Sequence, residues 1–116
     1  MRTRRFVPLI DVAVLAIRGK RALFVSGEEA RGLSQRDLAL IELLLDNRGR
    51  IVPYERFVSA MNWDNLRDRP EVLHNLRTHV WVIKKFLRKK RIAANIATAN
   101  FVGYALCEVL SKSSGG

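Results

Sequence analysis

Residues 70–91 have the sequence PEVLHNLRTHVWVIKKFLRKKR, and this stretch decides the fold. Its apolar residues recur at spacings of three and four, which places them on one face of an α-helix. They are Leu73, Leu76, Val80, Ile83 and Leu87. Polar and basic residues occupy the opposite face. The pattern predicts a long amphipathic helix that buries one side in a domain and leaves the other side open.

Basic residues dominate the charge of the chain. The 116 residues include 21 Lys and Arg against 11 Asp and Glu, which gives a formal net charge of +10. This balance favours anionic partners, with nucleic acid ahead of membrane surfaces. Hydrophobic residues make up 48% of the chain, which is enough for a core, and the length predicts a single domain.

Short strands are predicted before this helix. Three segments rich in strand-forming residues are separated by two turn-forming segments. The strands are expected at residues 9–17, 21–25 and 30–33, and the turns at 18–20 and 26–29. Together they predict a small antiparallel meander.

Two further helices are predicted between the meander and residue 70. Ser34 and Asp37 have the spacing of a capping box, and Gly49 suits the left-handed position that follows a helix. Pro53 fits the first turn of a second, shorter helix. Residues 62–69 are polar and are expected to form a loop.

A β-hairpin is predicted after the long helix, with strands at 95–98 and 104–107 and a tip at 99–103. Cys107 lies in an apolar run and is expected to be a small buried thiol. The predicted organisation is one α+β domain with two flanking segments. These are a basic N-terminal extension at 1–8, the domain at 9–110 and a flexible tail at 111–116.

Basic side chains crowd the end of the long helix. Neutralising phosphates requires cations along the nucleic-acid backbone. Six cations within residues 84–91 exceed the one or two that a helix dipole would explain. The predicted phosphate contacts are Lys84, Lys85, Arg88, Lys89, Lys90 and Arg91.

Polar residues nearer the start of the helix have the groups needed to contact bases. Asn75 could pair with adenine and Arg77 with guanine, and the methyl group of Thr78 could meet a thymine methyl. His74 could donate a hydrogen bond to a base or a phosphate. For each of these residues, a solvated polar surface is the alternative.

Two aromatic residues and a histidine have more than one interpretation. Trp81 lies on the presumed base-reading face and is the fifth base-contact candidate, which could stack on an exposed base. We expect it to pack against the strands or the hairpin, with a protein interface as the second interpretation. Phe101, at the hairpin tip, could wedge into a minor groove or dock on a partner. His79 is expected to be a partly buried histidine with a hydrogen-bonding partner.

Four groups of residues extend the pattern over almost the whole chain. They are Leu33-Ser34 with Asp37 and Leu40-Ile41; Asn47-Arg48-Gly49 with Val52 and Glu55; His79-Val80 with Ile83, Lys84, Lys85 and Leu87; and Thr98 with Gly103-Tyr104 and Leu106. In this combination the chain resembles the OmpR/PhoB-type effector domain of bacterial response regulators, without the phosphorylatable receiver domain that normally precedes it.

This resemblance implies a winged helix-turn-helix: an N-terminal antiparallel sheet, a three-helix core and a C-terminal hairpin wing. It implies a bacterial transcription regulator that places helix 70–91 in the major groove of double-stranded DNA. The cytoplasm is the location expected by default, because neither a signal peptide nor a membrane span is predicted. Hairpin 95–107 would lie on the adjacent backbone and minor groove, loop 62–69 could touch RNA polymerase, and a homodimer is common in such relatives. The implied wing residues are Thr98, Asn100, Phe101, Gly103 and Tyr104.

Other functions have different support. Asn100 and Phe101 stand where the family usually carries Arg and Gly, which motivates a protein-interaction adaptor as the alternative, and RNA binding shares the charge argument. We expect no enzyme, cofactor or metal, because the chain has no Gly-rich phosphate loop, no GxSxG and no spaced ligand cluster. No apolar stretch approaches the roughly 18 residues of a membrane span.

Overall fold

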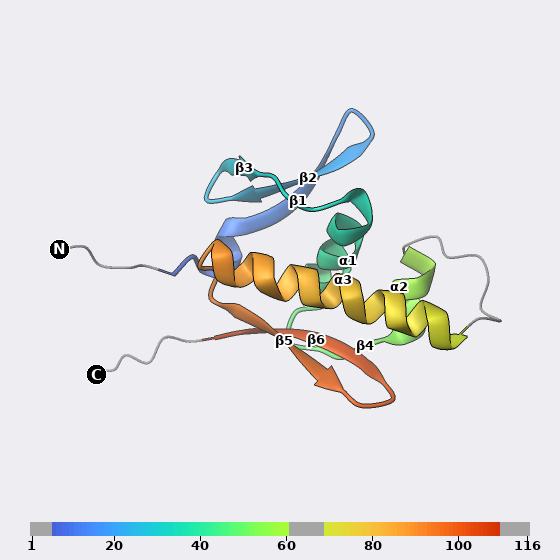
Figure 1. The fold of residues 1–116 in the computed structure, drawn as a ribbon. Coiled ribbons are helices and arrows are strands. Elements are labelled where there is room, and N and C mark those ends of the chain that lie inside the picture. The colour runs from blue at the N-terminus through green and yellow to red at the C-terminus, as the bar shows by residue number, and fades with distance from the viewer. Residues whose placement is uncertain (1–5, 61–68, 110–116) are drawn as a thin grey trace, which may run out of the picture.

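Three α-helices and two small antiparallel sheets form the part of the chain that the computed structural model describes, residues 6–60 and 69–109 (Figure 1). In chain order the elements are η1 (Leu9–Asp11), β1 (Val12–Ile17), β2 (Lys20–Val25), β3 (Glu28–Ala30), α1 (Gln35–Asp46), β4 (Val52–Pro53), α2 (Tyr54–Ala60), α3 (Arg69–Lys89), β5 (Ala94–Ala99) and β6 (Gly103–Glu108). The predicted α+β class is confirmed. Most of the predicted loop 62–69 and the predicted tail 111–116 lie outside the described residues.

The first sheet is the predicted meander, with the strand order β1-β2-β3. Both of its hairpins have two-residue loops, and every loop residue has a positive φ, from 53° at Ser26 to 84° at Gly27. Such loops match the twist of antiparallel strands. Because the loops are this short, β3 begins at Glu28, and the prediction of a strand at 30–33 was wrong. The first strand begins at Val12, since Leu9–Asp11 form a 3-10 turn.

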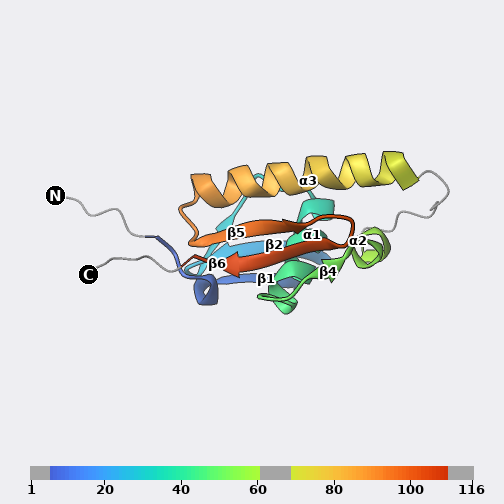
Figure 2. The ribbon, with the colours of Figure 1, turned by 90° about the horizontal axis from the view of Figure 1, so that it is seen from below.

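The core is formed by the three helices together with strand residues of both sheets, such as Leu23 and Leu106. The predicted apolar face of α3 is confirmed, because Leu76, Val80, Ile83 and Leu87 are buried and Leu73 is half-buried. These side chains join one cluster with Leu40, Ile41 and Leu44 of α1 and Phe57 of α2. In Figure 2, α3 runs along one edge of the molecule, and β5 and β6 lie beside it. The fold therefore buries one side of α3 and presents the other at the surface.

The end of α3 differs slightly from the prediction of a helix to Arg91. The helix ends at Lys89, and Arg91 adopts a left-handed conformation with φ 57°. The amide of Ile92 donates to the carbonyl oxygen of Leu87 at 2.9 Å, which caps the last turn. Val7 lies within the predicted N-terminal extension, yet its amide donates to the carbonyl oxygen of Arg91 at 2.7 Å.

The start of α1 is attached to the middle of α3 through Asp37. The predicted capping box is confirmed: the amide of Asp37 donates to Ser34 Oγ, and the amide of Ser34 donates to Asp37 Oδ2, both at 3.1 Å. The other carboxylate oxygen of Asp37 lies 2.6 Å from Nδ1 of His79 on α3. His79 is half-buried, as predicted, and its hydrogen bond to Asp37 orients α3 against α1.

The second sheet has the order β4-β6-β5 and contains the predicted hairpin. β4 was not predicted as a strand; Val52 pairs with Tyr104, and Pro53 pairs with Gly103. Pro53 lacks an amide hydrogen, and proline is tolerated on an edge strand. The expectation that Cys107 is buried was wrong. Its neighbour Leu106 points into the core, and successive strand residues point to opposite faces, so Cys107 is exposed.

Gly103 allows the two strands to approach each other. A Cβ atom at this position would lie 1.8 Å from the carbonyl oxygen of Val52, which no side chain tolerates. Gly103, which the family resemblance assigned to the wing, is therefore required by the close approach of β4. It lets β4 brace the hairpin next to its tip.

Candidate nucleic-acid interface

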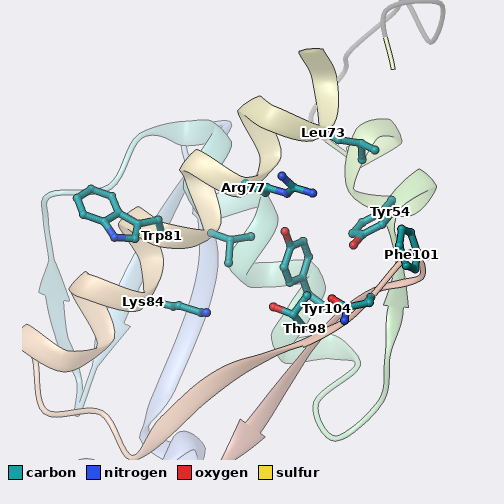
Figure 3. Close-up of a pocket in the computed structure, with 10 residues that line it drawn as sticks. Tyr54, Leu73, Arg77, Trp81, Lys84, Thr98, Phe101 and Tyr104 are labelled. Atoms are coloured by element: carbon teal, nitrogen blue, oxygen red, sulfur yellow. The ribbon is translucent and has the colours of Figure 1, made fainter. Parts of the chain in front are cut away.

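Helix α3 and the β5–β6 hairpin flank a groove of about 540 Å³, which we call the α3–hairpin groove (Figure 3). It is lined by Tyr54, Leu73, Arg77, Val80, Trp81, Lys84, Thr98, Asn100, Phe101 and Tyr104. The groove brings predicted residues of the long helix together with predicted wing residues, although about twenty residues of sequence separate the two sets. It therefore joins three of the residues predicted on the long helix, Arg77, Trp81 and Lys84, to four of the predicted wing residues, Thr98, Asn100, Phe101 and Tyr104.

Tyr104 forms the floor of the groove and joins three elements. Its buried ring meets Tyr54 and Phe57 edge-on, with ring centroids 5.6 and 5.9 Å apart. Burial raises the pKa of the Tyr104 hydroxyl above its usual value and the neighbouring Tyr54 raises it further, while hydrogen-bonded Arg77 has the opposite effect. Tyr104 therefore stays a neutral phenol and links the hairpin to both α2 and α3.

Arg77 brings a permanent positive charge to the rim of this groove. Its side chain is exposed and extends toward the hairpin side of α3, near Tyr104 and Tyr54 (Figure 3). A guanidinium has five N–H donors, more than one phenol oxygen accepts. Arg77 can therefore hold Tyr104 and still donate to a phosphate or a base.

The predicted phosphate contacts lie on two sides of α3. Lys84 lines the α3–hairpin groove, whereas Lys85, Lys89 and Lys90 line a second depression of about 310 Å³ that also includes Arg31. Arg88 is exposed on the helix, and Arg91 is exposed just beyond its end. The cations therefore lie along both sides of the second half of α3. We call them the basic ridge: Lys84, Lys85, Arg88, Lys89, Lys90 and Arg91.

No acidic residue interrupts this ridge in the sequence from Val72 to Arg91. The acidic side chains that the structure describes lie on η1, β3, α1, α2 and β6. Residues 72–91 therefore carry cations and no carboxylate, whereas the other described elements carry both cations and carboxylates. A stretch of this kind attracts polyanions.

The predicted base contacts are exposed on the first half of α3. His74, Asn75 and Thr78 face solvent outside the α3–hairpin groove. The hydroxyl of Thr78 donates to the carbonyl oxygen of His74 at 3.2 Å. Because the hydroxyl is used within the helix, the methyl group of Thr78 is the part suited to meet another molecule.

Trp81 is exposed, and the expectation that it packs internally was wrong. Its side chain is 58% exposed and borders both depressions. The ammonium group of Lys85 lies 4.4 Å from the ring centroid, in cation–π geometry. The Trp81 ring therefore stands on the outer side of α3 between the two depressions, because neither sheet covers α3 at this position.

Sequence reasoning missed Tyr54, Leu73 and Val80 as groove residues and Arg31 in the second depression. Leu73 and Val80 have the periodicity of core residues, and that pattern does not distinguish the core from its rim. Tyr54 enters the groove only because β4 places the start of α2 beside the hairpin. No local sequence pattern indicates this contact, because it depends on the pairing of β4 with β6.

No protein-family model and no curated protein matches this chain. Among the described residues, no three His, Cys, Asp or Glu side chains are grouped closely enough to hold a metal ion. The helices in residues 6–60 and 69–109 are too short or too polar to cross a membrane. The interpretation of the site therefore depends on its geometry and charge.

Proposed function

We propose that this protein is a DNA-binding transcriptional regulator of the winged helix-turn-helix type, similar to OmpR/PhoB effector domains. In this proposal α3 enters the major groove of DNA, and the β5–β6 hairpin lies as a wing on the adjacent backbone and minor groove. One observation carries the proposal: the outer side of α3 is exposed and cationic, without an acidic residue from 72 to 91, next to a braced hairpin.

The dimensions of α3 support this arrangement. The helix has 21 residues. At about 1.5 Å per residue it is about 30 Å long. The major groove of B-DNA is about 12 Å wide and admits a single helix. The exposed His74, Asn75 and Thr78 would then face base edges, while Lys84, Lys85 and Arg88 would face phosphates.

A protein-interaction adaptor is the second candidate, and two exposed aromatic side chains favour it. Trp81 is 58% exposed and Phe101 is 97% exposed, and aromatic residues are common at the centres of protein interfaces. RNA polymerase or another regulator would be the partner. Recovery of such a partner, lost on Trp81→Ala, together with no binding to duplex DNA would favour this function over the first.

Binding to duplex DNA should fall steeply with salt. Replacing Lys84, Lys85 and Arg88 by alanine should weaken binding to all sequences alike, because phosphate contacts carry no sequence information. The slope of log affinity against log salt should become shallower by about 3, since each lost phosphate contact contributes about 0.9. Fluorescence anisotropy across a salt series measures both effects.

A matched control removes the same charge elsewhere. Arg18, Lys20 and Arg48 are exposed and lie outside α3. Their triple alanine variant has the same net charge as the α3 variant but should keep the wild-type slope within about 1 unit. Equal losses in the two variants would mean that net charge alone drives binding, and the proposed docking of α3 would be wrong.

Asn75→Ala should relax sequence specificity instead of lowering affinity uniformly. A bidentate contact to a base contributes about 1–3 kcal/mol of discrimination at one base pair. Selection from random duplexes at a fixed salt concentration, followed by competition binding, measures this directly. A uniform loss of affinity on all sequences would instead assign Asn75 to the DNA backbone.

A further inference from the structure

Phe101 occupies the tip of the hairpin in a conformation that its side chain does not favour. Its φ is 67°, and its side chain is 97% exposed. The amide of Val102 donates to the carbonyl oxygen of Ala99 at 2.9 Å, so Phe101 is the third residue of a four-residue turn. A positive φ at this turn position favours Gly or Asn. The fold therefore displays a large ring from which it gains neither packing nor backbone stability.

Backbone contacts to β4 and α2 hold the hairpin tip that carries this ring. The amide of Tyr54 donates to the carbonyl oxygen of Val102 at 2.9 Å, and Pro53 pairs with Gly103. The start of α2 and the β4 strand therefore both hold the base of the turn. A ring on a braced turn loses little conformational freedom when it binds, so more of the contact energy is available for binding.

Cations lie across the groove from Phe101. Arg77 and Lys84 line the same α3–hairpin groove as the ring, and Figure 3 shows them on the helix side with Phe101 at the end of the hairpin. An apolar group beside positive charges is complementary to DNA, in which stacked bases lie between two rows of phosphates. Phenylalanine is among the side chains that wedge between base steps from the minor groove.

The size of the apolar area favours a wedge over a protein contact at the tip. Besides Phe101, the tip exposes only part of Val102, which is 49% exposed. A stable protein interface needs about 800 Å² from each partner. A wedge needs only one ring, because the stacked bases on both of its faces supply the contact.

We propose that Phe101 inserts between two base pairs from the minor groove and bends the DNA to which the protein binds. The inference rests on the proposed DNA-binding function and assigns the hairpin tip a role in deforming the duplex. The cations along α3 would hold the phosphates, and the ring would unstack one base step. Steps that unstack easily, such as TA, should be preferred at that position.

The experiment measures the bend in a duplex of about 30 base pairs with a central TA step and a fluorophore at each end. Energy transfer between the ends should rise when the full chain binds, corresponding to a bend of about 20–90°. 2-Aminopurine beside the step should brighten on binding, because its fluorescence is quenched while it is stacked.

Phe101→Gly is the decisive variant, since it removes the ring and suits the positive φ, so the fold is retained. It should bind the duplex with the same salt slope, but without the rise in energy transfer or in 2-aminopurine fluorescence. Phe101→Leu keeps an apolar wedge and should retain most of the bend. A loss of bending with Phe101→Gly but not with Phe101→Leu would show that the apolar side chain, and not a change in the fold, is responsible.

Other outcomes overturn the inference in distinguishable ways. Binding by the wild type that leaves the duplex straight, or an equal bend with Phe101→Gly, would overturn the wedge and leave DNA binding intact. A straight duplex together with a protein partner lost on Phe101→Gly would assign the ring to that partner. Failure to bind any duplex at low salt would overturn the proposed function, and the wedge with it.

Discussion

Gly103→Ala is expected to lower the free energy of unfolding by about 3 kcal/mol or more, as severe backbone clashes do. The added Cβ would lie 1.8 Å from the carbonyl oxygen of Val52 and 2.9 Å from Cα of Pro53. Both atoms belong to the backbone, so no flexible side chain can move aside. Either β4 separates from β6 or the hairpin shifts, and urea unfolding followed by circular dichroism measures the loss.

Gly49→Ala is the matched control for this prediction. Gly49 has φ 81°, and a Cβ there would meet nothing within 4 Å. Its substitution should cost only about 1 kcal/mol, the penalty for a left-handed backbone. If Gly103→Ala cost no more than Gly49→Ala, the close approach of β4 and β6 would not hold in solution.

Asp37→Ala is expected to cost about 3 kcal/mol, because one side chain performs two tasks. Its carboxylate accepts from the Ser34 amide in the capping box and pairs with His79 at 2.6 Å. Loss of a cap costs about 1 kcal/mol. Removing one partner of a largely buried hydrogen bond to a carboxylate costs about 1.5–3 kcal/mol. Asp37 is 6% exposed, so water cannot readily replace either contact. Thermal or urea unfolding measures the loss.

Two variants separate the tasks of Asp37. Asp37→Asn keeps an oxygen for the cap but removes the charge next to His79, so its effect should be intermediate. Asp46→Ala removes an exposed carboxylate from the last turn of the same helix and should change stability by less than about 0.5 kcal/mol. A double-mutant cycle of Asp37 with His79 should give a coupling energy above about 0.5 kcal/mol. Additive effects in that cycle would contradict the contact between Asp37 and His79.

Elements specified by local chemistry could be predicted from the sequence. The spacing of Leu76, Val80, Ile83 and Leu87 identified the buried face of α3, because a helix repeats every 3.6 residues. Ser34 and Asp37 identified the start of α1, since a capping box needs only residues three apart. The two hairpin strands followed from turn-forming residues between apolar runs.

Features that depend on contacts distant in sequence could not be predicted. β4 is two residues long, and only its pairing with Gly103 and Tyr104 makes it a strand. Likewise, Oε1 of Gln35 accepts from the amide of Arg21 at 2.9 Å, and Nε2 of Gln35 donates to the carbonyl oxygen of Arg21 at 2.8 Å. These two bonds pair the backbone of β2 where β3 no longer lies beside it. Neither contact has a sequence signature.

The candidate site was predictable in part for the same reason. Periodicity identified the outer side of α3, but it did not determine which neighbours cover that side. The exposure of Trp81 and the separation of Lys84 from Lys85, Lys89 and Lys90 depend on where the two sheets end. The sequence placed Phe101 at a hairpin tip, whereas its positive φ and the support from β4 and α2 depend on contacts distant in sequence.

The exposed thiol of Cys107 has a consequence for handling the protein. It is the chain's single cysteine, on β6. In air, two molecules can cross-link through this sulfur, and the covalent pair would imitate a dimer in hydrodynamic experiments. A reducing agent or a serine at this position removes the artefact. The same sulfur accepts a maleimide dye at one defined position, from which docking of the protein can be followed by distance.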